Sequence, residues 1–392
     1  MCGIIGYTGH RPAVPLVVEG LRRLEYRGYD SSGVCFVQNG KLNVVRAEGK
    51  LKMLEDKLAD REVSLATTGM GHTRWATHGA PTEENAHPHM AHRGSVCIVH
   101  NGIIENYQEH KTRLEGKGVC FSSETDTEVL VNCIEEELAS EASLLDAFAS
   151  ALRKAHGAYA VAMISPDEPE VVYAARKSAP LLLGIGAGEN FVASDIPAFL
   201  PYTRDVVFLE DGEIVRITPH SWEVFSLDTL KPVHKTPQRI EWDLQAAQKG
   251  GFKHFMLKEI FEQPRALADC MAGRVDQARL EVSVQELNNM PAPERLRIVA
   301  CGTSYHAGLW ALPLFEEWAG IPAAVEIASE FRYRNPLLLE NEMVLVISQS
   351  GETADTPAAV RTLRQKGCRF PAMCNVPPSR IARGALSVPL TP

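Results

Sequence analysis

Two different patterns of apolar and polar residues divide the chain. In the N-terminal part, short apolar or β-rich runs are separated by Gly, Pro and Asp, as in VVYAARK from Val171, FVASD from Phe191 and VVFLEDGEIVRIT from Val206. Runs of this kind are typical of stacked antiparallel strands. We therefore expect the N-terminal part to form antiparallel sheets.

From about Glu294 the pattern becomes a repeat of strand, loop and helix. The apolar runs are LRIVACGTS, AAVEIAS, MVLVISQSGET, FPAMCNV and LSVPL, and the helical pattern TADTPAAVRTLRQKG follows the third of them. Strands that alternate with helices predict a parallel, doubly wound α/β sheet, with LSVPL as its fifth strand.

The segment between these two parts reads as a linker followed by a helix. RIEWDLQAAQKGGF, from Arg239, is polar and ends in a Gly pair, which is typical of a connection between domains. The next run, from His254, predicts a helix that Pro264 interrupts. Its apolar face, which core packing would explain, consists of Phe255, Ile260, Phe261, Leu267 and Met271.

Length, charge and cysteine content exclude several classes of protein. The chain has 392 residues, enough for two or three domains, and a net charge of -9 that argues against nucleic acid or an anionic membrane as partner. No apolar stretch predicts a membrane span and no signal peptide is recognisable, so we expect a cytoplasmic protein. Nine cysteines without metal-ligand spacing fit a reducing compartment. We expect Cys35, Cys97, Cys120 and Cys133 to be small core residues, and no metal or organic cofactor.

The run CGIIG places a cysteine at position 2, where removal of Met1 would make it the N-terminal residue. A thiol is a strong nucleophile that is mostly protonated at neutral pH, and an adjacent α-amino group can accept its proton. Cys2 could thus supply both nucleophile and base. The alternative, which is favoured for Cys2 taken alone, is a small residue that simply follows the initiator.

Three polar clusters lie between short apolar runs: RWATHGAP from Arg74, NAHPH from Asn85 and HNGIIENY from His100. Together they indicate acyl transfer. Asn101 and Gly102, in HNGIIENY, offer a side-chain amide and an unobstructed backbone N–H to an oxyanion. Arg74 suits the carboxylate of an amino acid substrate, and Asp126, in SETDTEV, suits its ammonium group. The alternatives are a hairpin turn at Asn101–Gly102 and a surface ion pair between Arg74 and Asp126.

Together, CGIIG, LEYRGYDSSG, HTRWATHGAP, NAHPH, HNGIIENY and SETDTEV resemble the glutaminase domain of class II, N-terminal-nucleophile glutamine amidotransferases. The resemblance implies an α+β, four-layer αββα sandwich in which Cys2 attacks glutamine, and Asn101 and Gly102 form the oxyanion hole. It also implies that Trp75 gates the passage of ammonia. Glutamine would be held by Arg74, Thr77, His78 and Asp126. His87 and His100 receive no catalytic step.

Two strand ends of the C-terminal part are rich in hydroxyl groups. The runs CGTS, from Cys301, and SQSGET, from Ser348, each end a predicted strand and precede a helix. Ligands bind at the carboxyl ends of the strands in open α/β sheets, and helix N-termini favour anions, so a phosphate monoester is the expected guest. The alternative is that these hydroxyl groups only cap the two helices.

CGTSYHAG, EIASEFRYR and SQSGETADT are similar to a sugar isomerase domain, which binds phosphosugars. The order of domains resembles amidotransferases that convert D-fructose 6-phosphate and L-glutamine to D-glucosamine 6-phosphate and L-glutamate. These would be the substrates, with ammonia passing internally between the two sites. The implied domains are a glutaminase at 2–219, a linker with connecting helices at 220–286 and the first, partial sugar isomerase domain at 287–392. The sugar phosphate would be held by Thr303, Ser304, Ser348, Gln349, Ser350 and Thr353.

Two departures from the resemblance affect what we expect. RKSAPL, around Lys177, stands where the family commonly has Gly-Ser, which should alter only a loop. The chain ends at Pro392, whereas the family continues through a second sugar isomerase domain with the isomerisation groups. We therefore expect the glutaminase half-reaction and part of the sugar-phosphate site, with homo-dimers formed at full length. A stand-alone glutaminase with a sugar-phosphate-sensing domain is the alternative.

Overall fold

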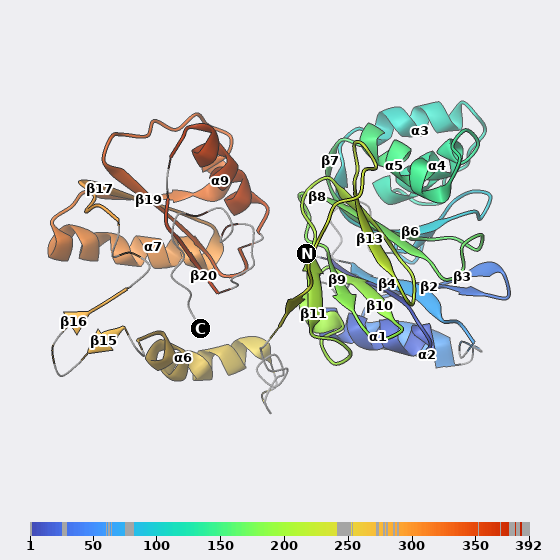
Figure 1. Cartoon of the computed structure of the whole chain (residues 1–392), viewed down its shortest axis with the longest axis horizontal. Coiled ribbons are helices and arrows are strands. Elements are labelled where there is room, and N and C mark those ends of the chain that lie inside the picture. Colours follow the sequence, from blue (N-terminus) through green and yellow to red (C-terminus); the bar gives the residue numbers. More distant parts are fainter. Residues whose placement is uncertain are drawn as a thin grey trace. The chain divides into compact units, whose positions relative to one another are not determined.

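The computed structural model divides the chain into two compact units, Met1–Gln248 and Lys249–Pro392 (Figure 1). We describe each unit by itself. The residues described are 2–25, 30–59, 61, 63, 65–74, 82–240, 252, 254–271, 274–276, 279, 281–284, 287, 290–351, 353–368, 370–375, 381 and 385.

The first sheet of the N-terminal unit is antiparallel and has the strand order β14-β11-β9-β10-β1-β4-β2-β3. One face is covered by α1 (Ala13–Leu24) and α2 (Leu51–Ala59). Helix α1 packs on the sheet because Val14, Val17, Leu21 and Leu24 recur on one side of it at helical spacing. The strands are β1 (Gly3–Thr8), β2 (Ser31–Gln38), β3 (Lys41–Glu48), β4 (Thr68–Arg74), β9 (Leu182–Ile185), β10 (Asn190–Ala193), β11 (Asp205–Phe208) and β14 (Gln238–Arg239).

The second sheet has the order β13-β12-β8-β7-β6-β5 and is also antiparallel. Its outer face is covered by α3 (Tyr107–Glu115), α4 (Asp126–Glu137) and α5 (Leu144–Lys154). Helix α5 begins after Ser143, whose hydroxyl oxygen accepts the N–H of Asp146 at 3.1 Å. The strands are β5 (His89–Met90), β6 (Cys97–Ile104), β7 (Gly157–Ile164), β8 (Val172–Lys177), β12 (Glu213–Ile217) and β13 (Trp222–Ser226).

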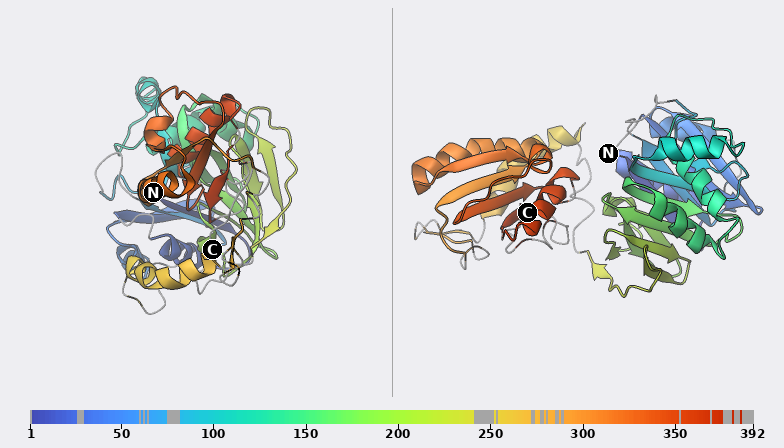
Figure 2. Two further views of the ribbon diagram at one scale, coloured as in Figure 1. Left: turned by 90° about the vertical axis from the view of Figure 1, so that its left-hand side faces the viewer. Right: turned by 90° about the horizontal axis from the view of Figure 1, so that it is seen from above.

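The inner faces of the two sheets meet in a core of fully buried apolar side chains, among them Ile4, Met70 and Val99. Figures 1 and 2 show the resulting order of layers: helices, sheet, sheet, helices. The predicted αββα sandwich is confirmed. The unit extends past residue 219, because β13 pairs with β12 and β14 pairs with β11.

The second unit contains a four-stranded parallel sheet with the order β18-β17-β19-β20, seen in orange to red in Figure 2. This confirms the predicted doubly wound sheet; LSVPL lies outside the described residues. The other elements are α6 (Phe255–Met271), the short strands β15 (Val275–Asp276) and β16 (Glu281–Val282), and a π-helical turn η4 (Phe315–Ala319). The elements of the sheet are β17 (Arg295–Ala300), α7 (Gly302–Leu314), β18 (Ala323–Ile327), α8 (Ala328–Phe331), β19 (Glu342–Ser348), α9 (Asp355–Gln365) and β20 (Ala372–Cys374).

Three sequence-based expectations are wrong. Helix α6 continues through Pro264; the carbonyl that loses its partner is that of Ile260, on a helix that faces solvent, where water can satisfy it. Core packing does not explain this helix either, since Phe261 and Leu267 are 65% and 62% exposed. Cys120 is exposed, while Cys35, Cys97 and Cys133 are buried as expected.

Candidate functional site

The strand pairing of the first sheet brings Cys2 beside Arg74. Gly3, at the start of β1, pairs with Thr73 of β4, so the next residue outward on each strand is Cys2 on one and Arg74 on the other. Burial lowers the pKa of the Arg74 guanidinium, and the carboxylate of Asp126 and the ionised form of the Cys2 thiol oppose that shift. The side chain of Arg74 is therefore a buried cation beside the candidate nucleophile.

The second sheet supplies the amide that faces Cys2. Nδ2 of Asn101, on β6, donates to the backbone carbonyl oxygen of Cys2 at 3.1 Å. The next residue, Gly102, has φ +130, and a Cβ there would lie 1.9 Å from the carbonyl oxygen of Ala158 on β7. Asn101 and Gly102 therefore lie inside a strand and do not form the hairpin turn that was the alternative.

The carboxylate of Asp126 lies at the N-terminus of α4 and is turned toward the same strand. Its Oδ2 accepts the backbone N–H of Ile104 at 2.7 Å, and the helix N-terminus favours a negative charge at this position. Asp126 is 6% exposed and Arg74 is 4% exposed, so the alternative of a surface ion pair is wrong. Two buried charges of opposite sign suit an amino acid substrate.

Four buried histidines lie close together near Asn101: His72, His87, His89 and His100. The ring of His87 lies 4.2 Å from that of His72, 5.0 Å from that of His89 and 6.4 Å from that of His100, measured between centroids. Burial lowers the pKa of all four, that of His72 to about 3. The imidazoles are neutral at physiological pH and serve as hydrogen-bonding groups.

Hydrogen bonds link this histidine cluster to α4. His87 Nδ1 accepts the N–H of His100 at 3.3 Å, and its Nε2 lies 3.2 Å from Oγ1 of Thr127. Because Nδ1 is the acceptor, Nε2 carries the proton and donates to Thr127. His89 Nε2 lies 3.1 Å from Oγ1 of Thr125, the residue that caps α4. The histidines thus position the helix that carries Asp126.

Sequence reasoning missed one residue of this site. His72 Nε2 lies 2.9 Å from Oδ1 of Asn101. A signal for it was present, because His72 is two residues before Arg74 on the same strand and therefore shares its face of the sheet. The predicted residues Trp75, Thr77 and His78 lie outside the described residues.

In the second unit, the two hydroxyl-rich loops meet at one edge of the sheet. β17 and β19 are adjacent and parallel, with Ala300 opposite Ile347, so their carboxyl ends lie side by side. The chain leaves β17 toward β18 on one side and returns to β19 on the other. This reversal is the point at which doubly wound sheets bind ligands.

Each of these loops leads into a helix N-terminus. Thr303 and Ser304 lie in the first turn of α7, and Thr353 lies two residues before α9 begins. Ser348 is 5% exposed, and its Oγ accepts the N–H of Gly351 at 3.0 Å. Its hydroxyl proton is not used in that bond. The loop residues Gln349, Ser350 and Thr353 are not buried.

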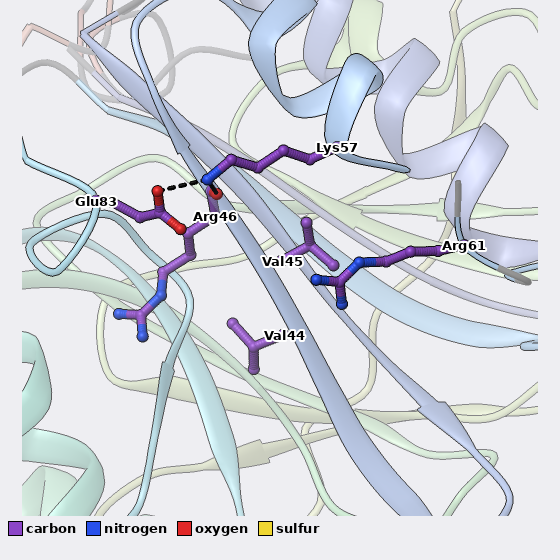
Figure 3. Close-up of a pocket in the computed structure, with 6 residues that line it drawn as sticks. All are labelled: Val44, Val45, Arg46, Lys57, Arg61 and Glu83. Carbon is purple, nitrogen blue, oxygen red and sulfur yellow. Dashed lines mark hydrogen bonds and ion pairs between the residues drawn. The ribbon is translucent and has the colours of Figure 1, made fainter. Parts of the chain in front are cut away.

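A hollow of about 430 Å³ on the first unit contains none of these candidate residues (Figure 3). Nζ of Lys57 donates to the carbonyl oxygen of Arg46 at 2.9 Å and also pairs with the carboxylate of Glu83. The Arg46 guanidinium donates to the carbonyl oxygens of Glu84 and Ala86. Lys57 and Arg46 thus have their partners within the fold.

Within the described part of the chain, no three or more His, Cys, Asp or Glu side chains gather as a metal site would require. Within the same part, no helix is long and apolar enough to cross a membrane.

Comparison with known proteins identifies both domains of the chain. Residues 72–201 match the family model of the glutamine amidotransferase domain, and residues 291–391 match that of the SIS domain. A glutamine phosphoribosylpyrophosphate amidotransferase from B. subtilis covers 95% of this chain, and 81% of that chain is matched, with a TM-score of 0.52 and 18% identity. That likeness shows the fold alone. The chain thus combines a glutamine amidotransferase domain with a SIS domain.

The relatives are more specific. Glutamine–fructose-6-phosphate aminotransferase [isomerizing] from Clostridium acetobutylicum is 46% identical over 391 residues, which are 98% of this chain and 63% of that protein. The protein of the same name from Thermus thermophilus is 46% identical over 383 residues, with the same coverage. The chain is thus similar over almost its whole length to glutamine–fructose-6-phosphate aminotransferases, and it spans about 63% of the length of these two relatives.

Proposed function

We propose that this chain is a glutamine-dependent amidotransferase that serves the conversion of D-fructose 6-phosphate and L-glutamine to D-glucosamine 6-phosphate and L-glutamate. The observation that carries the glutaminase half is the 3.1 Å bond from Asn101 Nδ2 to the carbonyl oxygen of Cys2, since it puts an amide donor next to the residue with the proposed nucleophile. The names of the relatives support the complete reaction.

The glutaminase chemistry begins once Met1 is removed. The α-amino group of Cys2 takes the thiol proton, and Sγ attacks the side-chain carbonyl carbon of glutamine. Nδ2 of Asn101 and the N–H of Gly102 stabilise the oxyanion, because their dipoles are fixed before charge develops. The amine returns the proton to the departing nitrogen, ammonia leaves, and water hydrolyses the thioester to glutamate.

The glutamine is held by charge at both ends of its amino acid group. Arg74 binds the α-carboxylate, together with Thr77 and His78, and Asp126 binds the α-ammonium group. Burial of Arg74 and Asp126 supports this assignment, because an ionic contact with the substrate is stronger away from bulk water. Trp75 gates the ammonia, which is kept from bulk water because protonation would remove its nucleophilicity.

The SIS domain binds the phosphate of the sugar. Helix N-termini and hydroxyl groups are donors that suit a phosphate dianion. The residues that would bind it are Thr303, Ser304, Ser348, Gln349, Ser350 and Thr353. We further propose a cytoplasmic protein that needs no cofactor and forms a homodimer.

Substitution of Cys2 tests the proposal. Purified Cys2→Ala should release no glutamate from glutamine, while the matched substitution of an exposed thiol, Cys120→Ala, should leave glutamate release unchanged. Mass spectrometry of the wild-type chain should find Met1 absent. Glutaminase activity in Cys2→Ala, or a retained Met1 in a fully active enzyme, would contradict the mechanism.

A further inference from the structure

The side-chain amide of Asn101 can act as an oxyanion donor in only one of its two orientations. Its Nδ2 and Oδ1 ends occupy almost the same space, but one donates hydrogen bonds and the other only accepts them. An amide turned by half a rotation would point a lone pair at the developing negative charge. Some contact must therefore select between the two orientations.

The contacts of His72 make that selection. Its Nε2 lies 3.1 Å from the backbone carbonyl oxygen of His100 and 2.9 Å from the side-chain amide of Asn101. A backbone carbonyl only accepts hydrogen bonds, so Nε2 must carry the ring proton. The atom of Asn101 that it meets must then be an acceptor, which is Oδ1. Nδ2 is left to donate to the carbonyl oxygen of Cys2.

The surroundings of His72 keep its ring in this state. The ring is fully buried and lies 4.2 Å from His87, centroid to centroid. Burial lowers its pKa to about 3, so the ring stays neutral. Among the described residues its Nδ1 has no hydrogen-bond partner. All of its polar contacts are thus made through Nε2.

We propose that His72 is a positioning residue that holds the amide of Asn101 with Nδ2 toward Cys2. This rests on the proposed function, in which Asn101 is an oxyanion donor, and it adds the residue that orients that donor. His72 does not touch the substrate. Its loss should lower kcat for glutamine hydrolysis and leave KM nearly unchanged, because an oxyanion forms only after binding.

Paired substitutions of His72 separate orientation from packing. His72→Gln keeps an N–H near the position of Nε2 and should retain most of kcat. His72→Phe keeps the buried ring without the donor, and His72→Asn keeps a polar side chain one methylene too short to reach Asn101. Both should lose kcat, by at most the ~10²- to 10³-fold that one oxyanion donor is worth. If His72→Phe does not fold, the kcat of His72→Asn can still be compared with that of His72→Gln.

Two controls complete the experiment. Tyr7→Phe removes another buried hydrogen-bond donor of the same unit, the hydroxyl group that donates to Glu189, without touching Asn101, and its kcat should stay near that of the wild type. If His72 acts through Asn101, then Asn101→Ala and the double variant with His72→Phe should have the same kcat. Independent losses of kcat that multiply in the double variant, or equal losses of kcat in His72→Phe and Tyr7→Phe, would overturn the inference. A wild-type chain without glutaminase activity would instead refute the proposed function.

Discussion

The backbone N–H of Ile104 donates to Oδ2 of Asp126 at 2.7 Å, and this bond joins the first residue of α4 to the strand that carries Asn101. Asn101 and Ile104 are three residues apart on β6. The spacing between the proposed oxyanion donor and the proposed ammonium site is therefore fixed by backbone geometry. The strand β6 thus sets the distance between the groups that would contact the side-chain amide and the α-ammonium group of glutamine.

The charge of Asp126 can be removed without removing this bond. Asp126→Asn keeps an oxygen that can accept the N–H of Ile104, but it loses the attraction for the α-ammonium group. We expect KM for glutamine to rise about 10- to 100-fold, since a hydrogen bond to a charged group contributes ~1.5–3 kcal/mol, with a smaller change in kcat. Steady-state glutaminase kinetics measure both.

Asp126→Ala serves as the comparison, because it also removes the acceptor for Ile104. It should destabilise the fold as well as raise KM, which denaturant titration would detect. An unchanged KM in Asp126→Asn would move the ammonium site to another carboxylate.

Gly102 provides a second prediction, since it has both a positive φ and a close neighbour. In Gly102→Ala the new Cβ would lie 1.9 Å from the carbonyl oxygen of Ala158, so β6 and β7 must separate. Gly40→Ala, in the turn between β2 and β3, has φ +69 and open space around it, and is the matched control. We expect about 1–2 kcal/mol of destabilisation in the control and a larger loss, with loss of glutaminase activity, in Gly102→Ala. Equal thermal unfolding of the two variants would contradict this.

The apolar patterns predicted the sheets of both units because these patterns are local and regular, whereas the αββα order of layers followed only from the family resemblance. Alternating runs gave the antiparallel sheets, and the strand–helix repeat after Glu294 gave the parallel sheet. The path of α6 could not be predicted in the same way. A proline and an apolar stripe normally indicate a break and a buried face. Here the helix continues through Pro264, and Phe261 and Leu267 remain exposed.

The site was predictable only in part, because some of its contacts are made between distant segments. The motifs identified Cys2, Asn101 and Asp126 as separate candidates. They could not reveal that Asn101 Oδ1 faces His72, 29 residues away in sequence, because that contact depends on how the two sheets stack. Nor could they show that His87 and His100 bind the same hydroxyl group of Thr127.

The neutral histidine cluster predicts how stability depends on pH. Unfolding exposes the imidazoles of His72, His87, His89 and His100, whose pKa values then return to about 6.5. Above that pH both states are neutral and the cluster adds no pH dependence. Below that pH the histidines bind protons in the unfolded chain but not in the folded chain, so the free energy of unfolding falls as the pH falls. For His72 the fall continues until its folded pKa of about 3.

Denaturant unfolding of the N-terminal unit at several pH values between 7.5 and 5 tests this point, with each buried histidine adding at most ~1.4 kcal/mol per pH unit well below pH 6.5. His89→Phe should reduce the slope of the unfolding free energy with pH by the contribution of one histidine. His220→Gln, at an exposed position, should leave it unchanged. A stability that is flat between pH 7.5 and 5 in the wild type would mean that the cluster accepts protons while folded.

The hydroxyl groups of the second unit should recognise the phosphate of a sugar and not its ring. Fructose 6-phosphate should bind and fructose should not. Ser350→Ala and Thr353→Ala should each weaken binding by about 1.5–3 kcal/mol, the contribution of a hydrogen bond to a charged group. Ser348→Ala should cost more, because Oγ of Ser348 also accepts the N–H of Gly351 and shapes the loop. Thr362→Ala, whose hydroxyl donates to the carbonyl of Ala358 within α9, is the control that should bind normally. Titration calorimetry with both sugars decides the matter: equal affinity for fructose and fructose 6-phosphate would show that these loops only cap their helices.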